Sequence, residues 1–389
     1  MEIKQIANLV NSVTQEISGE IAILEEDLSN VVAVGDSLAN VEGLDAYVRK
    51  LPNMIGRIVF VNRKYAGGAP RGILRDGWEY GSIKMKVRGK MPDAENNEAW
   101  DLQNNTVYSM EVFRRPDVEC KFVNQRETFS IPLSITEKAV RQSFHSAAEL
   151  NAFIDLIYNE VDKSMTVKMD ALIMRAIGNM IAETVYDGVG NTYGNTSVRA
   201  VNLLKLYNDQ YGTSLAAADA IYDKDFIRFA IFNMAKYRDY MKFMSTRFNI
   251  EQTAKFTPDE YNVTILLSDF AKAAGVYLYD ANGQFRVDNL TLGNVDTVPF
   301  WQGSGTSFAF SDLSSIDYDC ASDPTHHVNL SGILGVMFDH DAVVVSNEER
   351  YVTTAPYNAN GEFWNTWHKW NCEFSNWLDE NFVVFYVHD

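Results

Sequence analysis

The chain has 389 residues, 46% of them hydrophobic, and a formal net charge of −18. This apolar content supports a sizeable core and excludes a disordered or collagen-like chain. Mean hydropathy is −0.20 and no apolar run reaches about 18 residues, so we expect no membrane span, and the first residues are not typical of a signal peptide. Three widely spaced cysteines argue against a disulfide framework and favour a reducing compartment.

Basic residues concentrate between positions 49 and 90, where eleven lysines and arginines face two acids. This segment carries about +9 and the remainder about −27, and residues 339–389 hold nine acids against two bases. The acidic total excludes a protein that wraps nucleic acid with its whole surface. The split makes the chain electrostatically complementary to other copies of itself, although two separate solvated faces would give the same pattern.

The first third of the chain predicts one helix and then extended structure. Apolar spacing predicts a helix over 3–17, followed by an acidic loop or arm. Strand signals follow at 57–65, 78–88, 107–114 and 118–131. Together they predict a long two-stranded excursion, which would be marginal in water and would need to pack on something else.

The strongest local signal predicts a helix over 146–186. Ser146 and Glu149 form a capping box, and an uninterrupted apolar stripe follows until Asp187-Gly188. At 1.5 Å per residue this helix would span about 61 Å. A compact globule of this chain length would be about 55 Å across, so one such helix predicts a flat or elongated molecule. The alternative is two shorter helices broken near Ser164.

The remaining elements predict the α+β class, because helices and strands are segregated along the chain. A helix is predicted over 223–244, and a turn over 280–283. Strands are predicted at 263–267, 276–279, 334–345 and 382–387.

Motifs for catalysis or cofactor binding are absent: no nucleophile elbow, phosphate loop, dinucleotide fingerprint or zinc-protease motif occurs. The glycine-rich segment 65–72 lacks the lysine and hydroxyl of a phosphate loop. Asp339-His340-Asp341 and His326-His327 resemble metal ligands, but lone groups of this kind are more often turn residues. We therefore predict no catalytic, cofactor-binding or metal-binding residue and no cofactor.

Four of the seven tryptophans lie close together near the end of the chain: Trp364, Trp367, Trp370 and Trp377. Aromatic residues at this density favour a packing cluster in the core or at a subunit interface. A stacking platform for a sugar or a base is the alternative, and the acidic neighbours argue against nucleic acid.

Three segments resemble one known family. Residues 129–159 resemble the entry into the long spine helix of the major capsid proteins of small podoviruses, which are tailed bacteriophages. Residues 339–345 and 358–368 are similar to a strand and a following segment near the end of the same proteins. The three matches keep the family order and the segments between them have suitable lengths, so the resemblance covers most of the chain.

The resemblance implies the capsid fold shared by tailed phages and herpesviruses. The implied parts are an N-terminal arm (1–56), an extended β loop (57–131), a peripheral domain with the spine helix (132–189), an axial domain (190–335), a return to the peripheral domain (336–381) and a last axial strand (382–389). The extra immunoglobulin-like domain and the N-terminal scaffold of some relatives have no counterpart here, so we expect a separate scaffolding protein.

The implied function is structural: self-assembly, as hexamers and pentamers, into an icosahedral shell around double-stranded DNA, with a portal protein as partner and no membrane. The shell would assemble in the host cytoplasm, and DNA would be held without sequence-specific binding. We predict that Arg63, Lys64, Arg71, Arg75, Lys84, Lys86 and Arg88 contact the neighbouring subunit. One alternative is an encapsulin-like shell around enzymes. The other is a carbohydrate-active enzyme that uses the tryptophan cluster with Asp339 and Asp341, two carboxylates that would face the same side of one strand.

Overall fold

The computed structural model describes 126–277, 294–302 and 307–389, shorter stretches at 73–76, 84–89, 102–108 and 118–123, and residues 11, 32, 70, 94, 111, 113, 115, 117 and 292. The predicted helix 3–17, strand 57–65 and turn 280–283 lie outside these residues, apart from Asn11. No helix within the described part is long and apolar enough to span a membrane.

One sheet has four strands in the order β1-β11-β12-β4. These strands are β1 (Leu74–Asp76), β4 (Arg126–Thr136), β11 (Val343–Thr354) and β12 (Phe363–Asn376). Buried and half-buried residues alternate along most of β12, so every second side chain of that strand faces the core. β12 pairs antiparallel with both β11 and β4, and β1 pairs parallel with β11.

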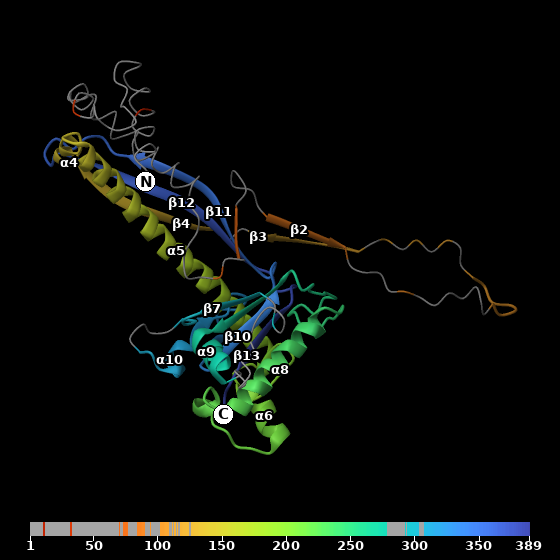
Figure 1. Ribbon diagram of the computed structural model, residues 1–389. Coiled ribbons are helices and arrows are strands. Elements are labelled where there is room, and N and C mark those ends of the chain that lie inside the picture. The colour runs from red at the N-terminus through yellow and green to blue at the C-terminus, as the bar shows by residue number, and fades with distance from the viewer. Residues whose placement is uncertain are drawn as a thin grey trace.

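Helix α5 (Ala147–Val189) is continuous over 43 residues, as its uninterrupted apolar stripe predicts. Ser146 Oγ accepts the N–H of Glu149, and the helix ends at Gly190, whose φ of 61° stops it two residues beyond the predicted Asp187-Gly188. The short helix α4 (Glu137–Ser143) precedes it. Figure 1 shows α5 running along the four-stranded sheet and into the region of the second sheet, so one helix supports both.

The second sheet has five strands in the order β5-β13-β10-β6-β7. These are β5 (Ala200–Asn202), β6 (Asn262–Leu267), β7 (Asn294–Val298), β10 (Ile333–Asp339) and β13 (Phe382–Tyr386). All residues of β10 and β13 are buried, because the strands lie at the centre of the sheet between covering elements. Those elements are α6 (Leu203–Tyr211), α7 (Ala217–Ala220), α8 (Lys224–Met241), α9 (Ser268–Tyr277), α10 (Phe310–Leu313) and the hairpin of β8 (Ile316–Asp319) and β9 (His327–Leu330).

The predicted strands at 263–267 and 382–387 and the helix at 223–244 are confirmed as β6, β13 and α8. The strand prediction for 276–279 is wrong at its first two residues, which end α9, a helix that buries Phe270 and Ala274 on one face. The strand predicted over 334–345 divides at residues 340–342 into β10 and β11, which belong to different sheets.

A two-stranded ribbon, formed by β2 (Lys84–Gly89) and β3 (Val118–Val123), projects from the body beside the four-stranded sheet (Figure 1). The described part of the predicted strand 107–114 is unpaired and continues this projection. Strand β4 begins three residues after β3 and crosses position 131, and β10 crosses position 336, so both sequence-derived boundaries fall within strands.

Candidate subunit interface

The ribbon has two chemically different faces. In its antiparallel register Lys86 lies opposite Lys121, Arg88 opposite Glu119, and Val87 opposite Cys120. Because successive side chains of a strand point to opposite faces, the charged residues share one face and the apolar ones share the other. The charged face is half-buried against the body, whereas Val87, Val118, Cys120 and Phe122 are exposed.

The charged face binds the loop between β12 and β13. Asp379 Oδ2 lies 3.0 Å from Arg88 Nη1 and 3.1 Å from Lys86 Nζ, and Lys86 also pairs with Glu380. Lys255 Nζ lies 2.6 Å from the Glu380 carboxylate. We call this group the junction cluster; it comprises Lys86, Arg88, Glu119, Lys121, Glu251, Lys255, Asp379 and Glu380. Its four basic and four acidic groups balance in charge.

Asp379 is the most enclosed member of the junction cluster, with a side chain only 2% exposed. Burial by itself would raise the pKa of this carboxyl, but the charges of Lys86, Lys121 and Lys255 outweigh burial and lower it. Lys86 Nζ also lies 4.7 Å from the ring centroid of Trp377. Since this loop joins β12 of one sheet to β13 of the other, the junction cluster anchors the ribbon where the two sheets meet.

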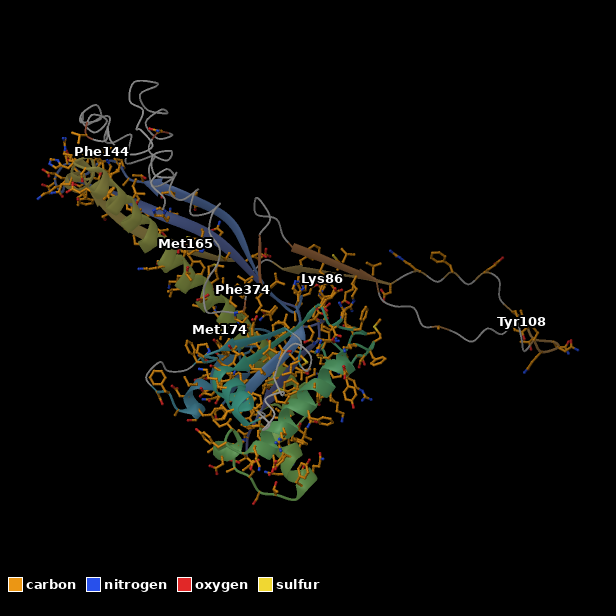
Figure 2. The ribbon with its side chains drawn as sticks, viewed as in Figure 1. Lys86, Tyr108, Phe144, Met165, Met174 and Phe374 are labelled. Atoms are coloured by element: carbon orange, nitrogen blue, oxygen red, sulfur yellow. The ribbon has the colours of Figure 1, made fainter. Side chains whose placement is uncertain are left out.

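The opposite, apolar face of the ribbon is left uncovered by the described part of the chain. Phe122 is 66% exposed, and Leu102, Val107 and Phe113 on the projecting segment are also exposed. Figure 2 shows Tyr108 near the far end of that projection, away from the body. Exposed apolar side chains gathered on one projection favour a protein interaction site.

The residues predicted to contact a neighbouring subunit fall into two groups. Lys86 and Arg88 belong to the junction cluster, so their charges already have partners in the same chain. Arg63, Lys64 and Arg71 lie outside the described residues, as do the side chains of Arg75 in β1 and Lys84 in β2. Sequence reasoning missed Lys121, Lys255, Asp379 and Glu380; the adjacent Asp379-Glu380 pair in the acidic C-terminal region was the available signal.

The four tryptophans do not form one cluster. Trp364 and Trp370 are buried on the core face of β12, where their rings pack against Tyr357 at 4.7 Å and Phe129 at 5.3 Å. Trp367, an odd number of residues from both, faces the other side of the sheet and is half-buried. Trp377 follows the strand and lies under Lys86. Two tryptophans therefore pack the core and one packs the ribbon anchor.

The Asp339-His340-Asp341 segment closes the turn between β10 and β11. Its three possible ligand atoms lie within 4.8 Å of one another, but Asp339 Oδ1 accepts the backbone N–H of Asp341 at 3.0 Å. Burial raises the pKa of Asp339, which disfavours the charged form that a hard cation needs. Strand β10 ends at Asp339, so the two carboxylates do not share one strand, contrary to the carbohydrate-enzyme alternative.

The other candidate pair, His326 and His327, has separate partners. The His327 ring nitrogens lie 2.8 Å from Asp319 and 2.9 Å from Asp317 across the β8–β9 hairpin. The ring of His326 stacks on Tyr186 at 4.0 Å. The two histidines therefore do not converge on one site.

Comparison with known proteins gives one family and several structures. A family model described as "Phi29-like phage major capsid protein" matches residues 10–386. The capsid of Staphylococcus phage Andhra is similar to this chain with a TM-score of 0.50 and 9% identity, over 85% of this chain and 88% of that one. The capsid of cyanophage P-SCSP1u has a TM-score of 0.47 and 12% identity, over 82% and 86%. No curated protein matches the sequence.

Proposed function

The chain belongs to the family of Phi29-like phage major capsid proteins, and from this premise we propose how its copies contact one another. Its role is structural: it is a subunit of a phage capsid shell, with the α+β capsid fold. Neither the enzyme-enclosing compartment nor the carbohydrate-active enzyme has support among the related proteins. Copies assemble as hexamers and pentamers into an icosahedral shell, and the ribbon of each copy lies on its neighbour.

This proposal is carried by the difference between the two faces of the ribbon. The charged face has its partners within the same chain, whereas the apolar face is exposed. The junction cluster holds the charged face on the body of its own chain. These charges are half-buried and already paired within the chain, so moving them to a neighbour would gain little. Burying the apolar face would gain about 25 cal/mol per Å² removed from water, and a neighbouring subunit supplies the necessary surface.

This proposal revises the contact predicted from charge alone. The neighbour packs on Val87, Val118 and Phe122, while Lys86 and Arg88 fix the direction of the ribbon from within the chain. For Arg63, Lys64, Arg71, Arg75 and Lys84 the contact with the next subunit stays a prediction.

Replacing Phe122 by serine tests the contact. The monomer should keep its circular dichroism spectrum and thermal stability, because the side chain is mostly exposed, and the yield of closed shells should fall at least about tenfold. Val167→Ala is the matched control, since Val167 is equally exposed on α5, and it should assemble normally. Normal shells from the Phe122 variant would contradict the proposed contact.

The parts of the subunit follow the same premise. The proposed divisions are an arm (1–56), an extended loop (57–131), a peripheral domain (132–189 and 336–381) and an axial domain (190–335 and 382–389). The continuous helix α5 and the separation of the two sheets support this division. The boundaries near residues 131 and 336 shift so that they do not divide strands β4 and β10. Limited proteolysis should cleave first within residues 102–108, the continuous described part of the projection, if the projection is separate from the two sheets.

Further partners are a separate scaffolding protein, a portal protein and packaged double-stranded DNA, with assembly in the host cytoplasm. The net charge of −18 supports DNA that is enclosed without specific binding. Expression of this chain with and without its neighbouring phage genes tests the scaffold: closed shells of uniform size from the chain alone would contradict the need for one.

A further inference from the structure

An aromatic groove lies between α6 and α8, on the domain that contains the five-stranded sheet. Its volume is about 770 Å³, and an adjoining hollow of about 460 Å³ shares Phe229, Asn233 and Lys236. Rings of Tyr207 and Phe229 meet edge to face at 5.4 Å in its floor, and Tyr211 lies 6.0 Å from Phe229. These contacts between the rings show that the floor of the groove is preformed.

Helix α8 also places one exposed aromatic side chain, Phe232, in the lining of this groove. The core face of the helix includes residues such as Phe226 and Met234. Phe232 lies on the opposite side of the helix from these residues and is 66% exposed. Lys236 Nζ lies 5.5 Å from the ring of Tyr240. An aromatic rim with a cation over it is suited to receive a further aromatic ring.

The opposite side of the same domain carries a single projecting aromatic residue. Phe308 is 93% exposed, although its neighbours are anchored: Ser307 Oγ accepts the N–H of Ala309 at 3.1 Å, and α10 follows directly. Figure 1 shows α10 and α8 on opposite sides of the β10–β13 core. One chain therefore cannot place Phe308 in its own groove.

The charges of the two surfaces are complementary. Residues 307–323 contain four aspartates and no lysine or arginine. Helix α8 with both of its caps, residues 223–242, contains five basic and three acidic residues. Arg238 and Lys242 also pair with Asp259, so this side carries a small net positive charge. Opposite net charges on the two sides of one domain favour head-to-tail contact between copies over contact between like surfaces.

We propose that Phe308 of one copy inserts into the α6–α8 groove of the next copy in the same ring, an inference that rests on the proposed shell assembly. The contact is heterologous, because two different surfaces of one chain meet. Repeating this contact around the axis of the ring of copies closes the ring. Each copy then inserts one Phe308 side chain and accepts one. This contact is separate from that of the ribbon.

Cross-linking of assembled shells tests this contact. In a Cys120→Ser background, Ala309→Cys, next to Phe308, and Gln210→Cys, on the rim of the groove, are combined, so that Phe308 and the aromatic residues of the groove are kept. The shells are treated with a short thiol-reactive bismaleimide. Cys320 and Cys372 are buried, and burial raises the pKa of Cys320 to about 11, so neither should react. Denaturing electrophoresis should show a ladder of covalently joined chains, and each single-cysteine variant should show none.

The matched control combines Ala309→Cys with Val167→Cys, an exposed position on α5, and should give no ladder. Phe308→Ala is the second variant: it should fold normally and lower the shell yield at least about tenfold. Shells that form without the ladder between positions 309 and 210, or a normal yield from Phe308→Ala, would overturn the inference and leave the shell role intact. If the unmodified chain forms no closed particles even when it is expressed together with a scaffolding protein, the proposed function itself fails, and the ring contact fails with it.

Discussion

Substitution of Asp379 by asparagine is the sharpest perturbation of the ribbon anchor, because it removes one charge and almost no volume. Asp379 lies 3.0 Å from Arg88 and 3.1 Å from Lys86, and 3.8 Å from both Lys121 and Lys255. Without its charge, four cations face three carboxylates. Breaking a fully buried ion pair costs about 3–5 kcal/mol, and an exposed pair contributes about 0–1 kcal/mol.

The partners of Asp379 are 20–25% exposed, so solvent screens part of the loss. We therefore expect a cost of about 2 kcal/mol, which raises the population of the detached ribbon about thirtyfold. Hydrogen exchange by mass spectrometry measures this directly. Peptides that contain β2 and β3 should lose protection by about that factor, while peptides from β6 and β10 should stay unchanged.

Glu127→Gln is the matched control, because it also converts a carboxylate to an amide. Glu127 pairs with Arg175 at 2.5 Å, but Arg175 is 53% exposed, so the change should cost less than about 0.5 kcal/mol. Unchanged protection of the ribbon in the Asp379 variant would refute the anchoring role of the junction cluster. An equal loss of protection in both variants would show that the effect is not specific to that cluster.

Three further predictions concern stability and DNA. Burial lowers the pKa of His368 from 6.5 to about 4. Between these pH values the unfolded chain binds more protons than the folded chain, so about 3 kcal/mol of stability should be lost as the pH falls through this window. Urea unfolding should show this loss and His368→Leu should abolish it; an unchanged pH slope in that variant would contradict the assignment. Ser146→Ala removes the N-cap of α5 and should cost about 1 kcal/mol in the same assay, whereas a cost near zero would mean that water replaces the cap. Purified empty shells should bind duplex DNA weakly at about 0.15 M salt, and tight binding would contradict an inner wall that repels DNA.

The long helix was predictable because its signals are local. The capping serine, the apolar stripe and the absence of proline all lie within one segment, and packing against both sheets reinforces them. Strand β12 was missed because its buried positions include Thr366 and His368, which interrupt the apolar alternation. The end of β10 was missed because the turn between β10 and β11 is only three residues long, 340–342, and the apolar runs on both sides of it resemble one strand.

The partner of the basic ribbon could not be predicted from charge. Lys86 and its acceptors Asp379 and Glu380 are separated by more than 290 residues, and the same opposite charges would suit a contact within one chain or between two. Only the fold, which brings the β12–β13 loop to the base of the ribbon, decides between them. The exposure of the apolar face of the ribbon could not be predicted either. In an alternating strand pattern, Val87 and Phe122 look like ordinary core residues.

Cryo-electron microscopy of this chain, expressed together with the phage genes that flank it, tests the central claim most directly. Closed shells are expected in which Val87, Val118 and Phe122 of each ribbon are covered by a neighbouring copy while Lys86 and Arg88 remain on Asp379 of their own chain. A preparation without closed particles would contradict the shell role. Shells in which Lys86 and Arg88 pair with a neighbouring copy would contradict the proposed arrangement of the ribbon.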